Sequence, residues 1–122
     1  TVRGIHISDW ENTTVNITNC NFAIETGDVK NNCLQISNYA NADELATLKV
    51  NFTNNNVVSA NGVVYFYHNL NNIAIDVFKG VLNFSGNTYA KDVDKIADRG
   101  QYTNAHVLYD QAKKDELAGL IK

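Results

Sequence analysis

The sequence predicts an all-β fold, a parallel β-helix of about three coils with a helical C-terminal cap. Three eight-residue segments repeat one pattern, and their starts lie 35 and then 32 residues apart: Val15–Phe22, Val50–Val57 and Leu82–Tyr89. A long period of this kind is typical of stacked units that bury apolar edges against one another. Inside each segment apolar and polar residues alternate as in a β-strand, and asparagines follow where the chain must turn sharply.

The alternation predicts three strand families, one for each side of the helix. Along each strand, apolar residues that point inward alternate with polar residues that point outward, such as Asn51 and Thr53. We assign residues 5–8 and 73–77 to the first face, 15–18, 48–53 and 81–85 to the second face, and 34–37 and 63–67 to the third face. Residues 42–46 have the pattern of a helical turn or a loop, in the place of a first-face strand.

The amino-acid composition limits the kinds of function that this chain can have. The chain has 122 residues, 19 asparagines and no proline, and its net charge is −3. Asparagine tolerates left-handed backbone and can form ladders between stacked positions. A negative net charge argues against binding a nucleic acid through bulk electrostatics. We see no apolar run of membrane-spanning length and no signal peptide. The absence of methionine favours a trimmed chain, a proteolytic product or the ordered part of a longer polypeptide.

The two cysteines do not have the spacing of a metal site. Cys20 and Cys33 lie 13 residues apart without neighbouring histidines. They are either two unpaired thiols or a disulfide that closes a short loop, and a disulfide would require an oxidising compartment. We therefore expect neither a metal nor a cofactor.

The last quarter of the chain changes character at residue 91. Val93, Ile96 and Ala97 have helical spacing, and Gly100 is a candidate helix C-cap. Asn104 is a candidate N-cap for a second helix that runs to Leu120. The sequence thus divides into parallel β-helix coils at 1–90 and a helical cap at 91–122, which either covers the last coil or docks onto another domain.

The repeated apolar-Asn-apolar-Thr-Asn-Asn pattern of residues 5–89 resembles the pectate-lyase-like superfamily of right-handed parallel β-helices. That superfamily includes polysaccharide lyases, glycoside hydrolases and bacteriophage tail spikes. The resemblance implies a right-handed helix and, for the lyases, a basic catalytic residue with calcium held by acidic residues. No matching constellation is found in this sequence, so the resemblance concerns the fold.

A candidate ligand surface lies on the third face. By alternation Tyr65 and Tyr67 point outward, His68 follows at the corner, and Gln35 with Ser37 should lie beside them in the coil below. Outward tyrosines can stack on sugar rings and donate hydrogen bonds. The same surface also suits an interface between copies of the chain, or ordinary strand formation.

A second candidate site surrounds the only tryptophan. Asp9 and Glu11 flank Trp10 after the first-face strand, and Asp76 aligns with Ser8 on the same face. Two carboxylates across a glycosidic bond can hydrolyse it, with the aromatic ring as a sugar platform. A solvated corner explains the same residues without catalysis. Glycosylation sequons occur at Asn12, Asn16, Asn51 and Asn83, as chance produces in an Asn-rich and Thr-rich chain.

These observations predict a rigid structural and carbohydrate-recognition module of an extracellular, cell-surface or virion-borne protein, such as part of a phage tail spike or fibre. Its partners would be a polysaccharide or cell-surface glycan, and copies of itself or further parts of a longer chain. Two alternatives remain. One is a fragment of a polysaccharide lyase or glycoside hydrolase, and the other is an antiparallel β-sandwich from a capsid or adhesin.

Overall fold

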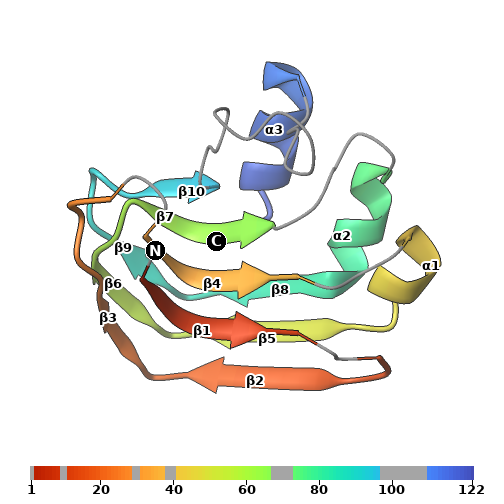
Figure 1. The fold of residues 1–122 in the computed structure, drawn as a ribbon, viewed down its shortest axis with the longest axis horizontal. Helices are drawn as coiled ribbons and strands as arrows, with labels where there is room; N and C mark the ends of the chain where they lie inside the picture. The colour runs from red at the N-terminus through yellow and green to blue at the C-terminus, as the bar shows by residue number, and fades with distance from the viewer. Residues whose placement is uncertain (1, 9–10, 29–30, 38–40, 67–72, 97–109) are drawn as a thin grey trace.

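The computed structural model describes residues 2–8, 11–28, 31–37, 41–66, 73–96 and 110–122. Short strands dominate these ranges, and the helices are few (Figure 1). The elements follow in the order β1 (Arg3–Ile7), β2 (Thr14–Thr18), β3 (Asn21–Ala23), β4 (Asn32–Ile36), α1 (Ala42–Leu45), β5 (Lys49–Thr53), β6 (Asn56–Ser59), β7 (Gly62–Phe66), α2 (Ile75–Val81), β8 (Leu82–Ser85), β9 (Thr88–Tyr89), β10 (Asp94–Ile96) and α3 (Gln111–Ala118).

The strands form three parallel sheets. Sheet A has the order β1-β4-β7-β10, sheet B the order β2-β5-β8, and sheet C the order β3-β6-β9. The chain therefore visits sheets A, B and C in turn, and we call each such round a layer. Every strand pair in the described ranges is parallel, so the antiparallel sandwich alternative is wrong.

The repeat alignment sets the register of sheet B. Val15 pairs with Val50, and Val50 pairs with Leu82, as the sequence predicts. A shift of one residue would turn every apolar side chain of a strand to the opposite face, so burial of one face holds this register.

The predicted membership of the other two faces is wrong. Ile5 pairs with Leu34, so the strand near residues 5–8 belongs to the same sheet as the strand near 34–37. The third side is sheet C, whose strands of two to four residues lie in segments predicted to be corners. A strand this short shows too few alternations to be recognised by periodicity.

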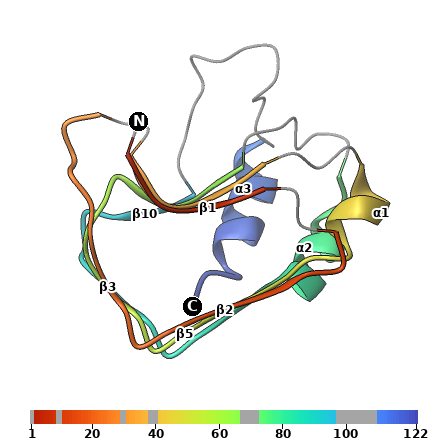
Figure 2. The same cartoon turned by 60° about the horizontal axis from the view of Figure 1, so that its bottom comes forward.

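Residues 73–77 do not form a strand. Ile75 begins α2, in which Phe78 and Val81 are buried one helical turn apart. The short Ile73-Ala74-Ile75 alternation hides this helical spacing. Figure 2 shows α1 and α2 on the side of the molecule where the chain passes from sheet A to sheet B. The predicted helical turn at residues 42–46 is confirmed as α1.

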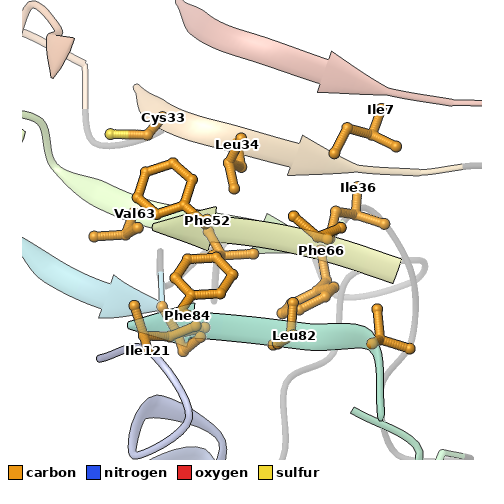
Figure 3. Close-up of a cluster of buried hydrophobic side chains, with 14 of the residues drawn as sticks. Ile7, Cys33, Leu34, Ile36, Phe52, Val63, Phe66, Leu82, Phe84 and Ile121 are labelled. Carbon is orange, nitrogen blue, oxygen red and sulfur yellow. The ribbon is translucent and has the colours of Figure 1, made fainter. Parts of the chain in front are cut away.

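The core runs between the three sheets. Ile17, Phe52 and Phe84 are 5%, 0% and 5% exposed, which confirms their predicted burial. The Phe52 ring lies 5.4 Å from that of Phe22 and 4.7 Å from that of Phe84, measured between centroids. Figure 3 shows Phe52 and Phe84 one above the other, with side chains of sheet A facing them. One apolar column thus ties the layers together.

The C-terminal segment covers the third layer but begins as a strand. Asp94–Ile96 form β10 in sheet A, so the helical prediction over Val93–Ile96 is wrong. A helix near the end is confirmed as α3, capped by the Asp110 side chain. The predicted Gly100 and Asn104 caps lie outside the described residues. The boundary at residue 90 stays a prediction.

The connections between sheets differ in how much their length varies. From sheet B to sheet C the equivalent positions are always seven residues apart: Val15 and Phe22, Val50 and Val57, Leu82 and Tyr89. From sheet A to sheet B the separation is ten, then sixteen, then eighteen residues: Ile5 and Val15, Leu34 and Val50, Val64 and Leu82. The extra length in the second and third layers contains α1 and α2.

The central ring of the core gives a stability prediction. We expect Phe52→Ala to lower the free energy of unfolding by about 3–5 kcal/mol, because it leaves a cavity between two stacked rings. Denaturant unfolding followed by circular dichroism measures the change. Val58→Ala is the control, since Val58 is 54% exposed. A midpoint for Phe52→Ala equal to that of the control would contradict the assignment.

Candidate functional site

The corner between sheets B and C has the same backbone in every layer. Asn19 and Asn54 have φ of 55°, and Gly86 has φ of 68° at the equivalent position. Asparagine and glycine are the residues that adopt this left-handed conformation most readily. A Cβ at Gly86 would lie 2.3 Å from Oδ1 of Asn54, so a side chain in the third layer would require the Asn54 amide to move.

An asparagine ladder, formed by Asn55 and Asn87, follows this corner inside the molecule. The Asn55 Oδ1 atom accepts a hydrogen bond from the Cys20 backbone N at 2.8 Å, and its Nδ2 donates to the Ile17 carbonyl at 3.0 Å. Asn87 repeats both bonds one layer later, with the Asn55 backbone N and the Phe52 carbonyl. Each amide thus satisfies backbone groups that the sharp corner would otherwise leave buried and unpaired. The stacked asparagines thus form a ladder of the kind that an Asn-rich repeat allows.

The outer face of sheet B is a regular polar surface, which we call the polar face. One column holds Asn16, Asn51 and Asn83, in register on neighbouring strands. The Asn51 Nδ2 atom donates to Asn16 Oδ1 at 2.8 Å. All three side chains are exposed or half-buried.

A parallel column of hydroxyls completes the polar face. It consists of Thr18, Thr53 and Ser85, two residues further along each strand. The Thr53 hydroxyl donates to that of Thr18 at 3.2 Å. Adjacent strands lie about 4.8 Å apart, and outward residues on one strand about 6.6 Å apart. The polar face is thus a flat grid of amide and hydroxyl groups.

This grid explains the glycosylation sequons. Residues on the same side of a strand are two positions apart. An outward asparagine followed by an outward threonine or serine therefore has the Asn-x-Thr/Ser spacing of a glycosylation sequon. Asn16, Asn51 and Asn83 therefore match the pattern as a consequence of the repeat. The outward pairs were visible in the repeat alignment, but sequence reasoning did not identify them as a site.

A groove of about 410 Å³ lies at the third-layer edge of the polar face. Grid residues of β5 and β8 line one side, and the end of α2 and the C-terminal residues line the other. The lining residues are Asn51, Thr53, Lys79, Leu82, Asn83, Phe84, Ser85, Leu120 and Lys122. The groove thus combines residues of the polar grid with the half-buried Leu120.

The charged residues that line this groove are both lysines, Lys79 and Lys122. The Lys79 Nζ atom lies 2.9 Å from Oδ1 of Asp76 and 4.0 Å from Oε1 of Glu116. The hydrogen bond and charge of Asp76 raise the pKa of Lys79, with a smaller contribution from Glu116. Lys79 is therefore held at the rim by exposed ion pairs and remains protonated.

The structure corrects the predicted tyrosine surface. Gln35 and Tyr65 are neighbours in register, as expected, but they are 3% and 0% exposed. Alternation shows which side of the strand a residue occupies, whereas a parallel sheet can be covered on both faces. Tyr67 and His68 lie outside the described residues. The exposed tyrosine surface therefore cannot include Tyr65.

The predicted carboxylate site is also not assembled. Asp9 and Trp10 lie outside the described residues, and Glu11 is exposed at the start of the chain segment that leads to β2. Asp76 lies on α2 and pairs with Lys79, so it does not share a sheet face with Ser8.

Other reactive groups are dispersed. The His6 Nε2 atom lies 2.6 Å from the Ser37 hydroxyl on the outer side of sheet A. Cys20 and Cys33 are both free thiols, so the predicted disulfide alternative is not present. Burial raises the pKa of Cys33 to about 12, which keeps its thiol protonated. In the ranges that the structure covers, no three His, Cys, Asp or Glu side chains gather as metal ligands would.

Comparison with known protein families, with curated proteins and with solved structures finds no match for this chain. No helix in the described part of the chain has the length and apolar character needed to span a membrane. The polar face and its groove are therefore the candidate site of the described residues.

The asparagine ladder gives a second stability prediction. We expect Asn55→Ala to lower the free energy of unfolding by about 1–3 kcal/mol, because the Cys20 N–H and the Ile17 carbonyl both lose their buried partner. Asn56→Ala is the matched control, since Asn56 is the next residue but is exposed. Thermal and denaturant unfolding of the two variants should separate clearly. Equal losses would show that the ladder adds nothing beyond strand pairing.

Proposed function

We propose that this chain is a short right-handed parallel β-helix that acts as a rigid carbohydrate-recognition module. In this proposal the chain belongs to an extracellular, cell-surface or virion-borne protein, such as a phage tail spike or fibre. Three parallel sheets visited in turn, with an asparagine ladder at one corner, support the β-helix. Its ligand is a polysaccharide or a cell-surface glycan.

The observation that carries the proposal is the grid of the polar face. Asn16, Asn51 and Asn83 offer amides that both donate and accept, and the adjacent column offers hydroxyls with the same ability. Sugar rings carry hydroxyls that also donate and accept. Because the backbone of each strand is held by its neighbours, binding orders few additional groups and loses little conformational entropy.

The groove at the edge of the polar face favours acidic sugars. Lys122 places positive charge there, while Lys79 shares its charge with Asp76 and Glu116 at the rim, and no acidic residue lines the groove. Carboxylate or sulfate groups on a glycan would be attracted to this charge, while the grid contacts the neutral hydroxyls. Leu120, which lines the groove and is half-buried, suits the less polar face of a sugar ring.

The alternative of a polysaccharide lyase or glycoside hydrolase fragment receives less support. A hydrolase needs two carboxylates on either side of one bond, and a lyase of the resembling type needs a base beside acidic calcium ligands. Glu11 lies before β2, whereas Asp76 is on α2 and paired with a lysine. The described residues therefore form a regular binding surface, whereas their carboxylates do not come together as a catalytic site.

The proposal predicts selective loss of binding on one face. We expect the chain to bind an acidic polysaccharide such as polygalacturonate better than neutral dextran. The double variant Asn51→Ala with Thr53→Ala should weaken this binding by about tenfold, through the loss of two or more hydrogen bonds. Isothermal titration calorimetry with size-defined oligosaccharides measures the change.

The control is Asn56→Ala on the neighbouring sheet. Asn56 is exposed, lies on the middle strand of sheet C and accepts a side-chain hydrogen bond from Thr88, as Asn16 does from Asn51 on sheet B. The affinity of the Asn56→Ala variant for the acidic polysaccharide should equal that of the wild type. Equal weakening in both variants, or no binding to any member of a broad polysaccharide panel, would contradict the proposal.

A further inference from the structure

The first layer leaves one end of the molecule open. β1, β2 and β3 are each the last strand of their sheet, and all three lie at the same end (Figure 1). Within the described ranges no strand pairs with their outer edges. A row of unpaired backbone N–H and C=O groups is a template for another strand.

Apolar side chains at this end are incompletely covered. Ile5 and Val15 are partly buried, although they point toward the core. Their register partners one layer further in, Leu34 and Val50, are fully buried. Val2, beside β1, is 44% exposed. The open end therefore presents apolar surface as well as backbone hydrogen-bonding groups.

Of the strands at this end, β2 lacks the usual protection of an edge, whereas β3 is short and its register against β6 shifts between Phe22 and Ala23. Natural edge strands carry charges, prolines or bulges that prevent pairing. β2 (Thr14–Thr18) and β3 (Asn21–Ala23) contain no charged residue and no proline. β1 contains Arg3, whose Nε donates to Gln35 Oε1 of the neighbouring strand in sheet A. Pairing this end with an identical one would not bring like charges together on β2 or β3.

The opposite end is covered. Leu117 of α3 and Ile121 are buried against the third layer. The Lys95 Nζ atom donates to the Ile121 carbonyl, and Asn87 Nδ2 donates to the Lys122 carbonyl. Among the described residues the first layer is uncovered and the last is covered, which disfavours head-to-tail stacking of copies.

We propose that the open end binds the same end of a second copy in a two-fold symmetric dimer. Figure 2 shows sheets A and B as two long sides that flank the short sheet C. A two-fold axis through β3 pairs β3 with β3 of the partner and β1 with β2 of the partner. Both β1 and β2 have five residues, and their arrows point in opposite directions across the molecule in Figure 1, so these pairings are antiparallel.

The free backbone groups of β2 can be identified from its bonds to β5. Lys49 N donates to the Thr13 carbonyl, and Asn19 N donates to the Thr53 carbonyl. Backbone groups alternate direction along a strand, so those of Asn16 face the open edge. The substitution Asn16→Pro therefore removes one edge N–H without removing a backbone hydrogen bond to β5. It also removes the side-chain hydrogen bond from Asn51 Nδ2, which the Asn51→Ala variant loses as well.

The first experiment measures mass. Multi-angle light scattering and sedimentation should give twice the 13.5 kDa of one chain at high concentration and dissociation on dilution. Asn16→Pro should raise the dissociation constant by about tenfold to a hundredfold, since each protomer loses an edge hydrogen bond. Circular dichroism checks that its fold is retained. Asn51→Ala on the central strand of the same sheet is the control and should dimerise normally.

The second experiment tests the geometry through a cross-link. In the antiparallel pairing of β1 with β2 of the partner, Val2 lies near the partner's exposed Cys20, whereas two Cys20 residues lie apart. Mild oxidation should therefore give a covalent dimer with Val2→Cys but not with the wild type. Val58→Cys is the matched control, as an exposed valine away from this end, and should give no dimer. Cys33 is buried and does not compete.

The outcomes separate the proposal from its competitors. A mass of one chain at every concentration would overturn it, and would leave the open end to another part of a longer polypeptide. Masses that increase beyond two chains would indicate open-ended stacking and also overturn it. A dimer that forms without the Val2 cross-link would contradict the two-fold arrangement. Dimer formation does not depend on glycan binding. A chain that fails to dimerise can still bind glycan, and a chain that fails to bind glycan can still dimerise.

Discussion

The sharp corner between sheets B and C is the constraint on which the rest of the structure depends. It requires left-handed backbone at Asn19, Asn54 and Gly86, and it turns buried backbone groups toward the interior. The amides of Asn55 and Asn87 satisfy those groups and join each layer to the one before it. Because the corner fixes where β2, β5 and β8 end, it also fixes the register of the polar face.

The part of the fold that repeats could be predicted, and the part that varies could not. Val15, Val50 and Leu82 recur with the same neighbours, so their pairing follows from alignment. Sheet C has strands too short for a period of two to be visible, and α2 replaces a strand where two isoleucines imitate alternation. Sequence position says nothing about what covers an outer surface.

That last limit explains the outcome for the candidate sites. Tyr65 has the side-chain chemistry and the strand position of a ligand-binding residue, but its surroundings bury it. The polar face consists of residues that look ordinary one at a time. Asn51 and Thr53 become a candidate site only because neighbouring strands repeat them at fixed spacing. Function in a stacked fold is therefore better sought in columns across strands than in single reactive residues.

The unequal connections described above determine where the chain can change length. An insertion between sheets A and B adds to a side that already holds α1 in one layer and α2 in the next, without moving a paired strand. A single residue inserted between Val50 and Val57 would displace Asn55 from the ladder and reverse the faces of β6. Deletion and insertion scanning should therefore find one permissive side and one intolerant corner. For an engineer, the permissive side is the place to graft a loop or a second domain.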